Sequence, residues 1–146
     1  MRGSVPAPAD LGSILARARR VLEGEDRVLY AIAFGSRVEG RGRRGSDLDI
    51  GIRYSTSGID PYELGSLASR LTAATGIDVH LVDLAGAPAS LRYVAFSKGV
   101  PILVRDRRAL VNDIARAVDE YLDIQPMQRR VSEGIRRALL NAHARP

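Results

Sequence analysis

Two aspartates separated by a single residue, Asp47 and Asp49, are the side chains of this sequence best placed to do chemistry. They open residues 47–52, a segment expected to form a strand, and side chains along a strand alternate between its two faces. Both carboxylates are therefore held side by side on one face. A pair of acids can equally be a solvated strand end, so its meaning depends on the residues around it.

The residues before the pair favour a phosphate-binding site. Residues 28–34 are an unbroken apolar run, as expected of a central strand covered on both faces, and Gly35 and Ser36 follow directly. A glycine lets the backbone approach a phosphate closely, and a serine adds a hydroxyl and an N–H donor. Ten residues then separate Ser36 from Asp47.

Positive charge is concentrated in two segments of the chain. The formal net charge is +5, and the basic residues are arginines apart from Lys98. Residues 37–44 hold four arginines against one glutamate, a local net charge of +3, and residues 125–146 hold five against one, a net charge of +4. Such clusters suit nucleotide phosphates, RNA or an acidic protein partner, although a codon bias toward arginine would give the same composition.

Composition and length exclude several classes of protein. The 146 residues, 45% of them hydrophobic, suffice for one ordinary domain. The absence of cysteine excludes disulfides, thiolate zinc sites and cysteine nucleophiles, so any metal would be held by oxygen or imidazole. No apolar run reaches the roughly 20 residues of a membrane helix, and no signal peptide is recognisable. We expect a cytoplasmic protein without membrane association.

Hydrophobic periodicity predicts an α/β (α+β) fold with a mixed sheet of about four strands flanked by helices. The expected elements are a helix at 11–22, strands at 28–34 and 47–52, a helix from Asp60 to a stop at Gly76, a strand at 77–84, a helix at 88–98, an edge strand at 100–104 that contains Pro101, and two final helices divided at Pro126. We divide the chain into a flexible N-terminus (1–8), a main domain (9–106) and a C-terminal helical extension (107–146) packed on the same domain.

Gly35-Ser36, ten residues and then Asp47-Leu48-Asp49 resemble the signature of the DNA polymerase β-like nucleotidyltransferases, specifically of their minimal (MNT) group. The match extends over residues 34–37 and 45–50, and the order of elements agrees from the first helix to about Asp106. Residues 121–126 are also similar to the family's helical tail. The resemblance implies the nucleotidyltransferase fold.

The chemistry implied by the resemblance is transfer of a nucleoside monophosphate from ATP or another nucleoside triphosphate, with pyrophosphate leaving. Mg2+ prefers carboxylate and phosphate oxygens, so Asp47 and Asp49 would join two metal ions to the triphosphate. The implied nucleotide-binding residues are Gly35, Ser36, Arg37, Arg44 and Ser46, with Arg43 as an alternative to Arg44. The arginines would neutralise the leaving pyrophosphate, or would merely be solvated in the loop.

The family places a third acid on the strand beside the Asp-x-Asp strand, and here the sequence departs from the pattern. His80 occupies the aligned position, whereas Asp78 lies two residues earlier on the same strand face. Asp78 could be the third catalytic acid and metal ligand after a small shift. His80 could be a ligand or base itself, or could mark a site that binds nucleotide without turnover.

Members of the minimal group are commonly antitoxins that bind a HEPN-domain ribonuclease toxin and attach AMP to one of its tyrosines. The resemblance therefore implies a protein adenylyltransferase antitoxin that uses ATP and Mg2+ and forms a hetero-oligomer with a HEPN toxin. One alternative is an RNA or tRNA nucleotidyltransferase, with the basic segments contacting RNA. Another is a catalytically impaired protein of the same fold that inhibits its partner by binding only.

Overall fold

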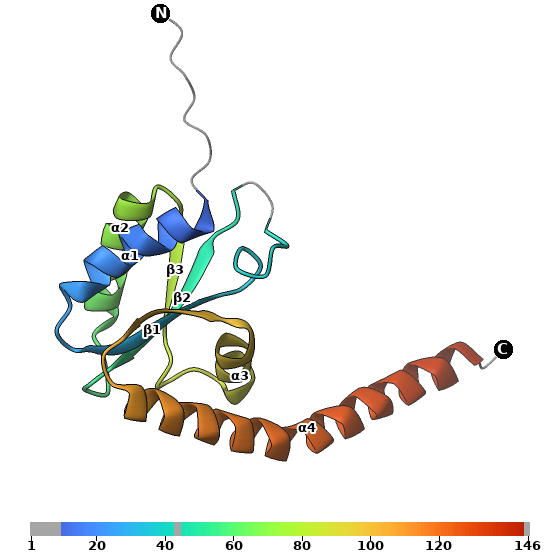
Figure 1. Cartoon of the computed structure of the whole chain (residues 1–146). Helices are drawn as coiled ribbons and strands as arrows, with labels where there is room; N and C mark the ends of the chain where they lie inside the picture. The colour runs from blue at the N-terminus through green and yellow to red at the C-terminus, as the bar shows by residue number, and fades with distance from the viewer. Residues whose placement is uncertain (1–9, 43–44, 145–146) are drawn as a thin grey trace, which may run out of the picture.

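A computed structural model shows a four-stranded sheet with helices on both of its faces (Figure 1). The structure describes residues 10–42 and 45–144, so the predicted flexible N-terminus, Arg43 and Arg44 lie outside the described residues. The elements in chain order are α1 (Leu11–Glu23), β1 (Val28–Phe34), β2 (Leu48–Tyr54), α2 (Pro61–Thr75), β3 (Val79–Asp83), α3 (Ala89–Lys98), β4 (Val100–Val104) and α4 (Arg107–Ala144). The predicted α/β class and mixed sheet are confirmed.

The sheet has the strand order β3-β2-β1-β4. β1 pairs antiparallel with β2 and with β4, whereas β2 and β3 run parallel. β1 is buried along almost its whole length, as its unbroken apolar sequence predicts for a strand covered on both faces. β4 lies at the edge of the sheet, which agrees with Pro101, because proline has no N–H to donate to a further strand.

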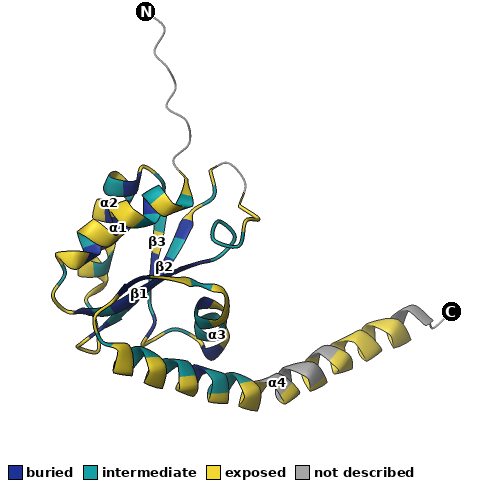
Figure 2. Cartoon of the chain, viewed as in Figure 1, coloured by how far each residue is buried: buried dark blue, intermediate teal, exposed yellow. Residues whose placement is uncertain are grey.

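The helices form two layers on opposite faces of the sheet. α1 and α2 cover the larger core, whereas α3 and the first half of α4 cover a smaller one (Figure 1). Alternation along β1 divides its side chains between them: Ala31 and Ala33 join the larger core, and Ile32 and Phe34 the smaller. Figure 2 shows the buried residues concentrated between the layers.

Local signals set the limits of α2 as the sequence predicts. The Asp60 carboxylate accepts a hydrogen bond from the Tyr62 N–H at 2.9 Å, and Pro61 occupies the first turn. Gly76 ends the helix with a φ of 77°, a left-handed conformation that glycine adopts at little cost. The helix is therefore held in place beside β3, the strand that follows it.

The C-terminal third differs from the expectation of two helices. Residues 107–144 form one helix, α4, with Pro126 inside it. Proline lacks the N–H for the carbonyl four residues earlier and crowds that carbonyl, so it bends a helix without always ending it. Figure 1 shows α4 changing direction about midway, and its second half projects away from the domain. No helix in the described ranges has the length and apolar character needed to cross a membrane.

Candidate functional site

The end of β1 and the start of β2 meet at one edge of the sheet. Phe34 pairs with Asp49 across the antiparallel ladder, so Gly35 comes next to Asp49. The neighbours of Asp49 in β2, Leu48 and Ile50, are buried in the core under α1 and α2. Because side chains alternate, Asp49 points to the opposite face of the sheet, where its side chain is 30% exposed.

Gly35 allows the chain to pass directly over the Asp49 carboxylate. Its φ is 89°, and a Cβ atom added to Gly35 would lie 2.3 Å from the Asp49 Oδ2 atom. Both the left-handed backbone and the close approach require glycine. The Gly35-Ser36 motif and the Asp-x-Asp motif are thus brought into contact, as the sequence predicts.

The loop between the two motifs is folded back by Arg37. The Arg37 Nε and Nη2 atoms donate hydrogen bonds to the Ser46 carbonyl oxygen at 3.0 and 2.8 Å. The Arg41 N–H donates to the Ser36 carbonyl oxygen at 2.9 Å. Arg37, predicted to bind nucleotide, therefore also fixes the backbone that leads into Asp47. Arg44, predicted for the same role, lies outside the described residues.

Glu39 ties this loop to α3. Its carboxylate pairs with Arg41 at 2.9 Å and with Lys98, at the end of α3, at 3.6 Å. The hydrogen bond from Arg41, and then the charges of Arg41 and Lys98, hold the pKa of Glu39 below its usual value. Glu39 and Lys98 are not among the predicted site residues, because no local pattern shows that residues so far apart in the chain will pair.

The remaining predicted acids lie at the adjacent ends of β2 and β3. Asp47 precedes β2 by one residue, Asp78 precedes β3 by one residue, and both are exposed. The two strand starts are joined by a hydrogen bond of 2.8 Å from the Leu48 N–H to the Asp78 carbonyl oxygen. In the ranges that the structure describes, no three His, Asp or Glu side chains gather into a metal-binding group. The structure therefore does not assemble Asp47, Asp49 and Asp78 as a ligand set.

His80 lies directly beside Asp49, as the predicted alignment of the two strands requires. The two residues are partners in the parallel ladder of β2 and β3, and the His80 Nδ1 atom is 3.2 Å from the Asp49 Oδ1 atom. The imidazole is largely exposed. Which atom carries the shared proton depends on the histidine tautomer. The side chain at the third position thus contacts the second aspartate of the motif.

The carboxylates of Asp47 and Asp49 are suited to Mg2+ that is bound together with a nucleotide. Mg2+ keeps several waters and is commonly held by one or two carboxylates plus substrate phosphates, and Asp47 and Asp49 offer two carboxylates at an exposed edge. The backbone at Gly35 approaches the Asp49 carboxylate so closely that a side chain at position 35 would collide with it. These residues suffice for a metal shared with phosphate, whereas an all-protein metal cage would need more ligands.

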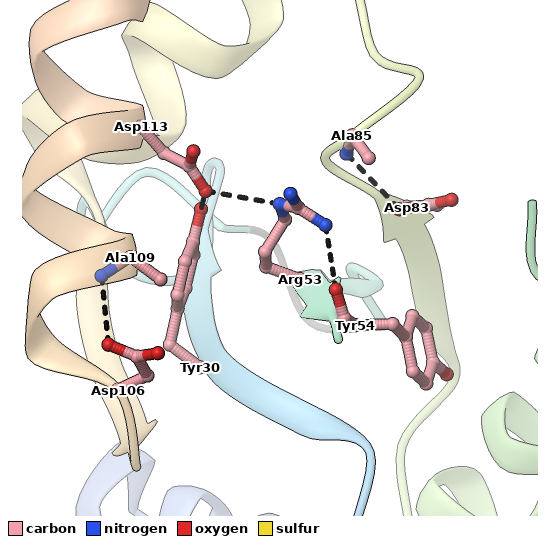
Figure 3. A network of polar contacts seen from close by, with 8 residues as sticks. All are labelled: Tyr30, Arg53, Tyr54, Asp83, Ala85, Asp106, Ala109 and Asp113. Carbon is pink, nitrogen blue, oxygen red and sulfur yellow. Dashed lines mark hydrogen bonds and ion pairs between the residues drawn. The ribbon is translucent and has the colours of Figure 1, made fainter. Parts of the chain in front are cut away.

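A second polar cluster lies deeper on the same face of the sheet and joins three elements (Figure 3). The Tyr30 hydroxyl donates to the Asp113 Oδ2 atom at 2.7 Å, and the Arg53 Nε atom donates to the same oxygen at 3.2 Å. Burial, and then the hydrogen bond to Asp113, raise the pKa of Tyr30 well above its usual value. Asp113 interrupts the buried stripe of α4, and such an acid signals a buried partner.

A separate cleft of about 210 Å³ lies at the other end of the sheet, between α2 and the start of β1. It is lined by Tyr54, Tyr62 and the ion pairs Arg27–Glu63 and Arg70–Glu25. Tyr54 pairs with Val28 at one end of the ladder, and Asp49 pairs with Phe34 at the other. The cleft is therefore remote from the Asp-x-Asp motif.

The family model for the polymerase β nucleotidyltransferases matches residues 17–108. The chain belongs to this nucleotidyltransferase family. The matched range begins in the second half of α1 and includes every element from β1 to β4, and with them Gly35, Asp49 and His80. The family assignment and the geometry of the site therefore agree on the same part of this nucleotidyltransferase, whereas almost all of α4 lies beyond it.

Solved structures of toxin–antitoxin complexes share the fold of this nucleotidyltransferase. A chain of a toxin–antitoxin structure with AMP-PNP is 21% identical with a TM-score of 0.73, over 83% of this chain and 97% of that one. A chain of the MntA–HepT complex is 19% identical with a TM-score of 0.69, over 84% and 96%.

A third chain comes from a complex of a tri-AMPylated Shewanella oneidensis HEPN toxin with an MNT antitoxin. It is 17% identical with a TM-score of 0.67, over 84% of this nucleotidyltransferase and 98% of that chain. No sequence among the curated proteins matches the chain. At these identities the structural likeness establishes the fold.

Proposed function

We propose that this nucleotidyltransferase is an antitoxin that acts in the cytoplasm, binds a HEPN ribonuclease toxin and transfers AMP from ATP to a toxin tyrosine with Mg2+. The observation that carries the proposal is the contact of Gly35 with Asp49, which brings the Gly35-Ser36 turn, proposed to bind phosphate, next to the second acid of the pair. The similar folds of complexes with AMP-PNP and with a tri-AMPylated HEPN toxin support ATP as substrate and the toxin as acceptor.

In the proposed reaction the tyrosine hydroxyl oxygen bonds to the α-phosphorus of ATP. The bond from that phosphorus to the oxygen bridging to the β-phosphorus breaks, pyrophosphate leaves, and the hydroxyl proton passes to a base. Asp49 and His80 are the groups beside Gly35 that can accept a proton. Backbone N–H groups at Gly35 and Ser36 would hold the triphosphate, with Arg37 and Ser46 closing the loop over it.

Mg2+ would be held by Asp47 and Asp49, and when bound it would neutralise charge on the phosphates. Asp78, at the start of the neighbouring strand, would join them as a third ligand only after a small shift, because the described residues hold no cluster of three acids. The chain's own part is to hold Asp49 on β2 with Asp47 one residue before it, and to leave position 35 without a side chain that would displace the Asp49 carboxylate.

The test is transfer of label from α-labelled ATP, with Mg2+, to a co-expressed HEPN-fold protein from the same genome. Wild type is compared with the double variant Asp47→Asn/Asp49→Asn. We expect label on the HEPN protein with wild type and none with the double variant. Label on RNA instead would replace this proposal by an RNA or tRNA nucleotidyltransferase.

His80 supports a second candidate function, inhibition of the partner by binding alone. An imidazole at the position of the third acid, in contact with Asp49, would compete with a metal ion for that carboxylate. A protein of this kind would bind ATP or its partner without labelling anything. The labelling experiment separates the two candidates, because only the first predicts a covalent product.

A further inference from the structure

The second half of α4 carries a bare apolar stripe. Val131, Ile135 and Leu139 follow one another at four-residue intervals and are 57%, 57% and 58% exposed. Ile124 lies on the same side of the helix, two residues before Pro126, and is also exposed. We call these four residues the distal stripe. Their spacing is that of a helix face that packs against something.

The distal stripe continues a face of α4 that is buried in its first half. Ala117 is fully buried there, and Leu110 packs against the smaller core. The Tyr121 ring, just before the distal stripe, stacks on Tyr93 of α3 with ring centroids 4.0 Å apart. At 100° per residue, residues 110, 114, 117, 121, 124, 131, 135 and 139 fall within about a third of the helix circumference. The same apolar face is thus covered by the domain along the first half of α4 and exposed along the second half.

The first half of α4 is firmly attached to the domain. Asp106 caps its first turn, accepting from the Ala109 N–H at 2.9 Å. Asp113 bonds to Tyr30 and Arg53, and Glu120 pairs with Arg92 (Figure 3 for Asp106 and Asp113). The second half therefore projects from a fixed base, as Figure 2 shows, and presents the distal stripe without a loop between it and the domain.

Charge on the rest of the helix indicates which surface would cover the stripe. Arg130, Arg136 and Arg137 are exposed on the sides away from the stripe, against Glu133. Residues 125–146 carry a net charge of +4, so two such helices from two copies would repel each other. Long arginine side chains reach around a helix to the rim of a groove, where acidic residues would pair with them.

We infer that the second half of α4 is a docking helix, which lays the distal stripe into an apolar groove with an acidic rim on a protein partner. The inference rests on the proposed function only in taking that partner to be the HEPN protein that accepts AMP. It goes beyond the family assignment, because the matched residues end at 108, near the start of α4.

The experiment measures the dissociation constant between the full chain and the co-expressed, purified HEPN-fold protein. The variant Val131→Gln/Ile135→Gln/Leu139→Gln removes the apolar face without changing charge. The matched control is Leu122→Gln/Leu140→Gln, because these leucines are equally exposed, at 55% and 60%, on the opposite side of the helix. We expect a loss of affinity of about 100-fold or more for the triple variant and about 2-fold or less for the control.

A charge variant tests the acidic rim. Arg130→Glu/Arg136→Glu/Arg137→Glu should weaken binding and flatten its dependence on salt. The inference is overturned if the triple variant binds the HEPN protein as wild type does. It is also overturned if the stripe instead supports a dimer of this chain in sedimentation, or binding to vesicles of anionic lipid, or if wild type forms no complex with the HEPN protein.

Failure of docking and failure of catalysis give different results. Asp47→Asn/Asp49→Asn should bind the HEPN protein with wild-type affinity while transferring no AMP. If wild type shows stripe-dependent binding but no transfer, the docking helix stands and the adenylyltransferase proposal fails. If the triple variant labels the HEPN protein as fast as wild type at low concentration, docking by α4 fails and the catalytic proposal stands.

Discussion

The His80 Nδ1 atom lies 3.2 Å from the Asp49 Oδ1 atom, across the parallel pairing of β2 and β3. Asp49 is therefore in contact with Gly35 through one carboxylate oxygen and with an imidazole through the other. An imidazole in this place can orient Asp49, take a proton from the acceptor, or occupy the oxygen that a metal would need. These roles make opposite predictions for a substitution of His80.

Substituting His80 distinguishes a working site from an impaired one. If His80 orients Asp49 or accepts a proton, His80→Ala should lower the rate of AMP transfer by about 10- to 100-fold, and His80→Asp should not restore it. The measurement is the initial rate of label transfer at saturating ATP. A rate that rises in His80→Asp would show instead that the natural site is impaired and that the acid completes it.

Removing the charge of the acid pair should stop transfer without unfolding the protein. Asp47→Asn and Asp49→Asn keep the size of each side chain, and both sites are partly or fully exposed, so the melting temperature should stay within a few degrees of wild type. Each variant should lose about 100-fold or more of its transfer rate, because two carboxylates are needed to hold Mg2+ with the triphosphate. Transfer that survives both substitutions would place the chemistry elsewhere.

Gly35 should tolerate no side chain. In Gly35→Ala the new Cβ atom meets the Asp49 carboxylate in a left-handed backbone, so we expect a loss of about 1–3 kcal/mol in the free energy of unfolding and a loss of transfer. Gly65, exposed inside α2 with no atom within 4 Å of an added Cβ, is the control. Gly65→Ala should raise stability by about 0.5–1 kcal/mol and leave transfer unchanged. Urea unfolding of both variants measures these changes in the free energy of unfolding. Equal changes in Gly35→Ala and Gly65→Ala would contradict the prediction.

The parts of this molecule that follow from local sequence were predictable. The apolar run of β1, the capping of α2 by Asp60 and the edge position of β4 each depend on nearby residues, and the structure agrees with them. The shared face predicted for Asp47 and Asp49 rests on strand alternation; Asp49 lies within β2, whereas Asp47 lies one residue before it. The alignment of His80 with Asp49 required the resemblance to a family, because it depends on the register between two distant strands.

The features that were missed depend on how the folded backbone runs, which the residue types alone do not show. Pro126 is a local signal for a helix end, yet α4 continues through it, because the surrounding turns supply enough helix to absorb one missing hydrogen bond. Arg37 was assigned to phosphate, and only the folded loop shows its bonds to the Ser46 carbonyl. Sequence patterns predict the residue types at the site better than their bonding partners.

Tyr30 should make the fold sensitive to alkaline pH. The unfolded chain releases the tyrosine proton near pH 10, whereas burial and the bond to Asp113 raise the pKa of Tyr30 in the folded protein. Above pH 10 the unfolded state therefore binds fewer protons than the folded state. The free energy of unfolding should fall by about 1.4 kcal/mol per pH unit for this group, from pH 10 up toward the raised pKa, and the contribution should be fully present below pH 10.

Urea unfolding between pH 8 and pH 11 measures this loss, and three variants assign it. In Tyr30→Phe the free energy of unfolding should fall less steeply with pH above pH 10. At pH 8 this variant should be less stable than wild type by about 1 kcal/mol, since the hydrogen bond to Asp113 is lost. Tyr54→Phe should remove a further part of the slope, because burial also raises the pKa of Tyr54. Tyr62→Phe, at an exposed tyrosine, is the control for the loss of a hydroxyl group. If Tyr30→Phe kept the wild-type slope, Tyr30 would not be held protonated by the Asp113 network that anchors α4 to the sheet.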